Sequence, residues 1–221
     1  MNALYKSIIW DWNGTLFNDI DYNYGIVAKM LKKRGVQGFD KKEYRGAFCF
    51  PIIDFYKKVG FDVSEPSQYR DLVEEYGELY DRDVFLCEVE EYAVEAIDYL
   101  NKKGMRQYLL SGLNECKLKE QVEHYGIDFY FDSIIGSSKN DASDKMSNAL
   151  ELISTFDVNM KTCLMVGDTV YDAQIADCVG CDVVLYSRGH QDKSILMKTG
   201  KRVMDSLKEI MLFFVGEEKS E

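Results

Sequence analysis

Five short runs of consecutive apolar residues, rich in β-branched side chains, recur along the chain. They cover residues 7–10, 107–110, 133–135, 162–166 and 182–186. An apolar run without alternation predicts a strand that is covered on both faces, as in a parallel sheet. We therefore expect a parallel sheet at the centre of the fold.

The segments between these strands carry apolar residues at helical spacing. Predicted helices cover residues 90–103, 115–125, 145–156, 171–178 and 206–214. Strands that alternate with helices predict right-handed βαβ units. The predicted fold class is therefore α/β, with a doubly wound, Rossmann-like parallel sheet.

One interval, from about residue 18 to residue 85, contains no convincing buried strand. Its amphipathic helical segments cover residues 21–34, 51–59 and 67–83, with apolar positions at helical spacing. We predict a core domain made of residues 1–17 and 86–221 and an inserted helical cap domain at residues 18–85. Hinges are expected at residues 17–19 and 83–87.

Charge and composition limit the classes of molecule that this protein is expected to bind. The 221 residues are 46% hydrophobic and 29% charged, and the formal net charge is −11. Nucleic acid and anionic membrane surfaces are therefore expected to be repelled. A small phosphorylated metabolite remains compatible, because a bound divalent cation reverses the local field.

Sequence features at the N-terminus and along the chain favour a cytoplasmic protein. We expect a monomer or a homodimer, and the sequence does not decide between them. The chain starts without a basic region and a long apolar stretch, and no apolar run reaches the length of a membrane span. Cys178 and Cys181 have C-x-x-C spacing, but no second pair accompanies them. We interpret both as ordinary small apolar side chains.

Two predicted strands end in acidic residues. The first leads into Asp11-Trp12-Asn13-Gly14-Thr15, and the strand at 162–166 leads into a segment with Asp168 and Asp172. Each Asp alone could be a turn former or a helix cap. Together, at the carboxyl ends of parallel strands, they predict a crevice that holds a hard cation through oxygen ligands, most simply Mg²⁺.

These motifs resemble the first and fourth motifs of the haloacid dehalogenase-like hydrolases, and the resemblance extends over nearly the whole chain. Ser111, at the end of a predicted strand, is similar to the second motif. The third motif, a lysine near the start of a helix, is matched best by Lys145, with Lys139 as the competitor. The proline usual after that lysine is absent, so both alternatives stay open.

The resemblance implies roles for these residues. Asp11 would be a nucleophile that forms an aspartyl-phosphate. Asp11, Asp168 and the backbone carbonyl of Asn13 would ligate Mg²⁺, and Asp172 would support the metal or the lysine. Ser111 and Lys145 would contact the phosphoryl oxygens. Thr15 and Gly112 are also expected to bind substrate.

Asn13 departs from the family pattern, in which phosphatases place an acid–base Asp. An amide cannot transfer that proton, and the loss of a general acid typically costs about 10² to 10⁴ in rate. Three explanations remain open: a substrate with a good leaving group, a weak or regulatory descendant, or an engineered replacement.

The helical insert resembles the small cap of one branch of the family, which covers the site. Arg45, on this insert, is a candidate contact for an anionic substrate tail. His190, in a loop after the last of the five strands, is expected at the rim of the site as a loop residue rather than a catalyst. His124 lies near a predicted helix end, where a cationic side chain suits the helix dipole.

The predicted function is a magnesium-dependent phosphatase that acts on a small phosphorylated metabolite, with the phosphoglycolate phosphatase-like branch as the nearest resemblance. The alternative is a catalytically weak phosphate-binding or regulatory protein, because Asn13 replaces the acid–base Asp. A sugar phosphotransferase is a further alternative that position 13 disfavours. Neither the substrate nor the oligomeric state follows from the sequence.

Overall fold

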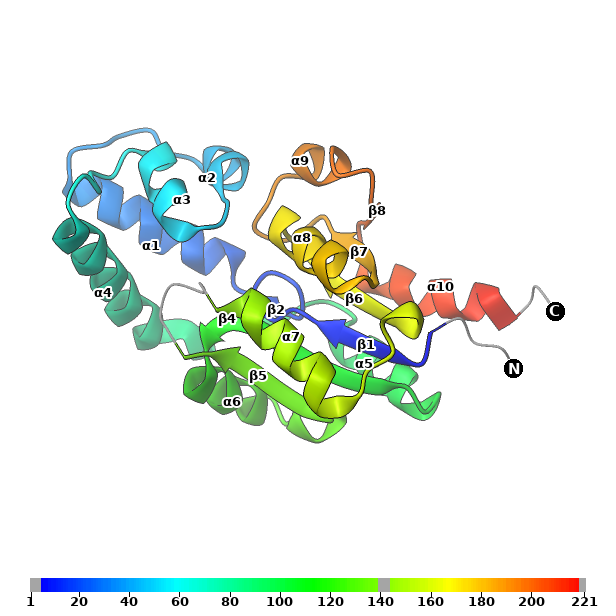
Figure 1. Cartoon of the computed structure of the whole chain (residues 1–221). Coiled ribbons are helices and arrows are strands. Elements are labelled where there is room, and N and C mark those ends of the chain that lie inside the picture. The colour runs from blue at the N-terminus through cyan, green and yellow to red at the C-terminus, as the bar shows by residue number, and fades with distance from the viewer. Residues whose placement is uncertain (1–4, 139–143, 219–221) are drawn as a thin grey trace.

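A six-stranded parallel sheet forms the centre of the molecule, in the order β5-β4-β1-β6-β7-β8 (Figure 1). The computed structural model describes residues 5–138 and 144–218, the last four by their backbone alone. The strands are β1 (Ser7–Trp10), β4 (Arg106–Asn114), β5 (Ser133–Ser137), β6 (Cys163–Gly167), β7 (Asp182–Tyr186) and β8 (Arg202–Met204).

Helices cover both faces of this sheet, which confirms the predicted doubly wound α/β fold. One face carries α5 (Ala93–Lys102), α6 (Glu115–His124) and α10 (Leu207–Glu218); the other carries α7 (Lys145–Phe156), α8 (Val170–Val179) and α9 (Lys193–Met197). In β1, Ile8 and Trp10 pack into the first core layer and Ile9 into the second. Side chains alternate between two buried faces, so the strand reads as continuously apolar.

Four α-helices form an insert between β1 and α5 in chain order. They are α1 (Ile20–Lys33), α2 (Lys41–Ala47), α3 (Ile52–Val59) and α4 (Pro66–Asp83). They form a group at the left of Figure 1, beyond the end of β1. The chain enters and leaves this group through β2 (Phe17–Asn18) and β3 (Glu88–Val89), which pair antiparallel.

Several short elements were absent from the sequence prediction. Two-residue strands such as β2 and β3 are too short to show a period. Helix α2 does carry a signal, since Asp40 and Glu43 form a capping box at its start. Short 3₁₀ helices cover Val84–Leu86, Asp128–Tyr130 and Met160–Thr162.

The turn after β1 is held rigidly by buried aromatic packing. Trp12 stacks on Phe17, with ring centroids 5.2 Å apart and planes 7° apart. The Trp12 indole N–H also donates to Gln121 Oε1 at 2.7 Å. The backbone between Asp11 and Phe17 is therefore fixed against the core, which positions the polar groups of this turn.

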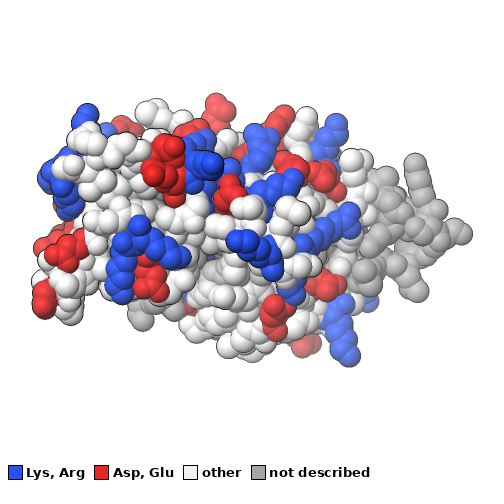
Figure 2. Space-filling view, turned by 90° about the horizontal axis from the view of Figure 1, so that it is seen from above, with Lys and Arg blue, Asp and Glu red and all other residues white. Residues whose placement is uncertain are grey.

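The surface carries no broad region of a single sign on the face shown in Figure 2, where basic and acidic side chains are interspersed. Within residues 5–138 and 144–218, no helix combines the length and the apolar character that a membrane span requires. All six cysteines are free thiols, with Cys178 exposed and Cys181 buried.

Candidate active site

Asp11 lies at the carboxyl end of β1 and forms a buried ion pair with Lys145. The Asp11 backbone N–H donates to the Val166 carbonyl at 2.8 Å, so the pairing of β1 with β6 extends to this residue. Lys145 Nζ lies 2.7 Å from Asp11 Oδ1 and 2.7 Å from Asp172 Oδ1. The lysine side chain is only 3% exposed. One ammonium thus links β1 to the start of α7 and of α8.

Asp172 has two roles at once. Its Oδ2 accepts hydrogen bonds from Thr169 N–H at 3.0 Å and Thr169 Oγ1 at 2.6 Å, which completes a capping box at the start of α8. Its Oδ1 accepts from Lys145. One oxygen of this carboxylate therefore caps the start of α8, while the other contacts the lysine.

Asp168, after β6, is enclosed by backbone. The His190 backbone N–H donates to Asp168 Oδ2. A Cβ at Gly14 would lie 2.4 Å from Asp168 Oδ2, and Gly14 has φ +71°. A Cβ at Gly189 would lie 2.2 Å from Asp168 Cβ. Both glycines are required by the close approach of their backbone to this carboxylate.

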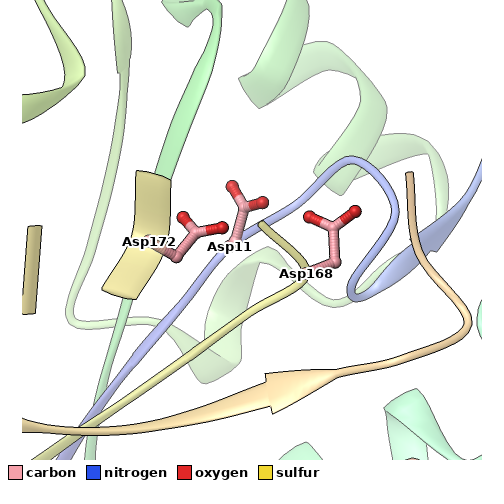
Figure 3. A group of neighbouring side chains, drawn as sticks. All are labelled: Asp11, Asp168 and Asp172. Carbon is pink, nitrogen blue, oxygen red and sulfur yellow. The ribbon is translucent and has the colours of Figure 1, made fainter. Parts of the chain in front are cut away.

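The three carboxylates of Asp11, Asp168 and Asp172 gather around one point, with ligand oxygens within 4.8 Å of one another (Figure 3). Burial raises the pKa of Asp11 well above its usual range; Lys145 lowers it, while Asp172 and Asp168 raise it further. Burial also raises the pKa of Asp168 to about 6, against the opposing effect of His190.

The same charges determine the protonation state of Lys145 and the kind of ion that would fit this cluster. Burial lowers the pKa of Lys145, but the carboxylates of Asp11 and Asp172 outweigh it, so the pKa is raised and the lysine stays cationic. One ammonium offsets only one of three negative charges. A divalent cation with oxygen ligands would neutralise the two negative charges that remain.

Asn13 is oriented by a second buried carboxylate, that of Asp19. The Asn13 amide donates from Nδ2 to Asp19 Oδ2 at 2.6 Å and to Tyr80 Oη at 2.8 Å. Asp19 is fully buried and also accepts from the Gly14 N–H at 3.0 Å. Both amide protons of Asn13 are occupied, so its Oδ1 is directed toward Ser111, whose Oγ lies 3.4 Å away.

Ser111 comes to the site because β4 continues past its predicted end. The pairing of β4 with β5 is irregular between Leu110 and Asn114. In this irregular stretch, Ser111 Oγ accepts from the Leu113 N–H at 3.1 Å and is almost fully buried. Gly112 follows it and lines the active-site cavity.

Two predicted substrate contacts take other positions. Thr15 is fully buried, and its Oγ1 lies 3.5 Å from Asp168 Oδ1 rather than at the cavity wall. Arg45 does not line the cavity either: its Nη2 donates to the carbonyls of Ser187 and Gln191, the latter at 2.9 Å. The Arg45 guanidinium thus fastens α2 to the loop after β7, and its expected contact with the substrate stays a prediction. Lys139 lies outside the described residues.

His190 is more deeply placed than the sequence indicated. It is 4% exposed and lines the cavity. Its Nδ1 lies 2.9 Å from Tyr44 Oη, and its Nε2 lies 3.2 Å from Asp19 Oδ1. Burial disfavours the charged ring, but the Asp19 carboxylate outweighs burial and raises the pKa of His190.

The groups around His190 were missed because nothing in the local sequence links them. Asp19 and Tyr44 lie on the insert, 171 and 146 positions before His190. The only available signal was the position of His190 after a parallel strand, which places it at the same edge as Asp11.

An active-site cavity of about 350 Å³ extends from these groups into the helical insert. Asp11, Lys145 and Asp168 line one end, and side chains of α1, α3 and α4 line the other. Such a volume is in the usual range for small-molecule sites, about 300 to 1,000 Å³. The cavity thus has a charged end at Asp11, Lys145 and Asp168, and an opposite end lined by the insert, which we term the organic end.

Fold and site together define an α/β enzyme-like crevice in which a carboxylate, a buried lysine and further acidic groups meet at the carboxyl ends of parallel strands. The chain belongs to the haloacid dehalogenase-like hydrolases, since the model of that family matches residues 8–186. The resemblance seen in the sequence motifs is thereby confirmed.

Individual relatives are distant but align over most of the chain. A phosphoglycolate phosphatase from Cereibacter sphaeroides is 22% identical over 193 residues, 83% of this chain and 86% of the relative. A haloacid dehalogenase-like hydrolase from Streptococcus pneumoniae has a TM-score of 0.81 at 18% identity, covering 97% of this chain and 100% of that one. A predicted phosphatase from Clostridium acetobutylicum has a TM-score of 0.80 at 20% identity, covering 96% of this chain and 99% of that one. The solved structures show the shared fold.

The enclosure of Asp168 gives a first prediction. Gly189→Ala should displace the Asp168 carboxylate, because the new methyl group would overlap it. Misplacement by about 1 Å is expected to lower turnover about 10²-fold. Gly46→Ala in α2, where a Cβ meets nothing within 4 Å, is the control. Equal phosphate release by both variants would refute the requirement for glycine at 189.

A second prediction separates the two lysines. Lys145→Met removes the ammonium between Asp11 and Asp172 and should lower turnover by about 10² to 10³, as the loss of one preorganised charge donor usually does. Lys139→Met is the matched comparison and should leave kcat within about twofold. The reverse pattern would assign the phosphate lysine to position 139.

A third prediction concerns Asn13 and Asp19. Asn13→Asp alone would place two carboxyl groups where Nδ2 and Oδ2 are now 2.6 Å apart, so the pair must share a proton or separate. The single variant should therefore melt at a lower temperature. Adding Asp19→Asn should recover stability and raise turnover of alkyl phosphates by about 10² over the parent.

Thermal unfolding and phosphate release measured on the single and the double variant test this coupling. If Asn13→Asp alone keeps the parental melting temperature and reaches the full gain in turnover, Asp19 does not restrain position 13.

Proposed function

We propose that the protein is a magnesium-dependent phosphatase that hydrolyses a small phosphorylated metabolite through an aspartyl-phosphate on Asp11. The observation that carries this proposal is the buried contact of Asp11 with Lys145, beside Asp168 and Asp172 and within reach of Ser111. The names of the relatives from Cereibacter sphaeroides and Clostridium acetobutylicum support the phosphatase activity.

In the first step, a carboxylate oxygen of Asp11 forms a bond to phosphorus while the bond from phosphorus to the leaving oxygen breaks. Lys145 holds the Asp11 carboxylate by a 2.7 Å contact and supplies positive charge beside the transferring group. The Ser111 hydroxyl is available to donate to a phosphoryl oxygen. Water then attacks the phosphorus, which releases phosphate and regenerates Asp11.

Mg²⁺ bound by Asp11, Asp168 and the carbonyl of Asn13, with Asp172 in support, would neutralise phosphoryl charge. The Asn13 amide is not acidic enough to protonate the leaving oxygen, and both its N–H groups are engaged by Asp19 and Tyr80. The leaving group therefore departs as an anion or takes its proton from water, which favours substrates with acidic leaving groups. We further propose that residues 18–85 act as a cap that excludes water from this step.

A fourth prediction tests the nucleophile. Asp11→Asn keeps the size of the side chain but removes the attacking oxygen charge, so phosphate release in Mg²⁺ should fall by at least about 10³. Asp182→Asn, a change of the same kind at an exposed site where the side chain accepts from Tyr5, should retain parental turnover. Substantial activity in Asp11→Asn, or full parental activity in EDTA, would contradict the mechanism.

A further inference from the structure

The organic end of the active-site cavity is built mainly from aromatic rings. Seven aromatic residues of the insert line it, and we term them the aromatic wall: Tyr44, Phe48, Phe50, Phe55, Tyr56, Tyr76 and Tyr80. The rings hold one another in place. Tyr44 and Phe55 meet edge to face at 5.4 Å, and Tyr76 and Tyr80 stack at 5.9 Å.

The hydroxyl groups of three of these tyrosines already have protein partners. Tyr44 Oη bonds to the His190 ring, Tyr76 Oη donates to Asn23, and Tyr80 Oη accepts from Asn13. These hydroxyls are engaged at the cavity margins, so their residues offer rings rather than free polar groups to a ligand. The wall is suited to an apolar or aromatic surface.

Positive charge is scarce around this cavity. Among its described lining residues, the lysines are Lys145, held by Asp11 and Asp172, and Lys117, which lies 2.7 Å from both Asp81 carboxylate oxygens. The ring nitrogens of His190 contact Tyr44 and Asp19. Lys117 is in an exposed ion pair with Asp81, so the described lining offers a carboxylate on the substrate no buried cation that lacks a partner.

Helix α4 adds negative charge and space to the same end. The cavity is lined by two sets of α4 residues at helical spacing: residues 73, 77 and 80, and residues 74, 78 and 81. Glu74 and Glu78 are exposed carboxylates at its edge. Gly77, between them, leaves open space, because a Cβ there meets no atom within 4 Å. An anionic tail would be repelled here, whereas a ring has room.

We propose that the substrate is a phosphate monoester whose leaving group is an uncharged, ring-bearing group, and not a carboxylate-bearing one such as phosphoglycolate. This inference rests on the proposed phosphatase function and specifies its substrate class. The aromatic wall binds the ring by apolar burial, while the charged end binds the phosphate. Discrimination arises because a carboxylate would lose its hydration without gaining a cation.

Two phosphonates of matched length test this specificity without turnover. 2-Phenylethylphosphonate carries a ring where 3-phosphonopropionate carries a carboxylate. Calorimetric titration of each into the protein with Mg²⁺ should show the ring ligand binding at least about tenfold more tightly, as burial of an aromatic side group would give. Inorganic phosphate, titrated alone, reports on the charged end.

A matched pair of glycine variants locates the ring. Gly77→Leu should weaken 2-phenylethylphosphonate at least about tenfold, because the leucine fills the space beside the aromatic wall, and should leave inorganic phosphate within about twofold. Leucine favours a helix more than glycine does, and thermal unfolding checks that the variant folds. Gly25→Leu, exposed on α1 and away from the cavity, should change neither affinity.

The outcomes distinguish a wrong substrate class from a wrong phosphatase function. If phosphate binds and 3-phosphonopropionate binds as tightly as the ring ligand or more tightly, the substrate class is wrong and the phosphatase function stands. Equal ring affinity in parent and Gly77→Leu also overturns the proposed location. If phosphate itself does not bind in the presence of Mg²⁺, the proposed function fails and the substrate class fails with it.

Discussion

Electrostatic repulsion among buried carboxylates is the constraint on which the site depends. Asp11, Asp168 and Asp172 come from two segments of the chain and lie almost completely out of water. Charges so enclosed are stable only when they are paired or bound to a cation. Lys145 is placed between two of them, and the sheet keeps all four groups from separating. The fold therefore holds an excess of negative charge at one edge of the sheet. The proposed binding of a divalent cation follows from that excess.

The fold and the charged residues were predictable because they obey local rules. Continuous apolar runs indicated the parallel strands, and the acidic residues directly after β1 and β6 must meet at one edge of such a sheet. The confirmed fold class and family follow from these features. Lys145 was one of two alternatives, and its contact with Asp11 and Asp172 favours it on geometry.

The remaining features depend on contacts between distant segments, which no local pattern encodes. Asp19 reads as an ordinary turn residue, yet it orients Asn13 and contacts His190 from 171 positions earlier. Arg45 shows the opposite case, since a cation near the site was expected to bind substrate and here donates to backbone carbonyls. Only the packing of the insert against the core decides between these uses of the same side chains.

The pairing of β2 with β3 has a consequence for how such a protein can diversify. Phe17 and Val89 are opposite each other in this ribbon, so the two ends of the intervening segment are neighbours in space. Loop-closure entropy changes only slowly with length when the ends are fixed close together. The segment can therefore lengthen, shorten or be exchanged as a cassette while the pairing of the central strands stays intact. Evolution and protein engineering can alter the insert while the strands that carry Asp11 and Asp168 stay in place, provided that the contacts of Asp19 and Tyr80 with Asn13 are kept.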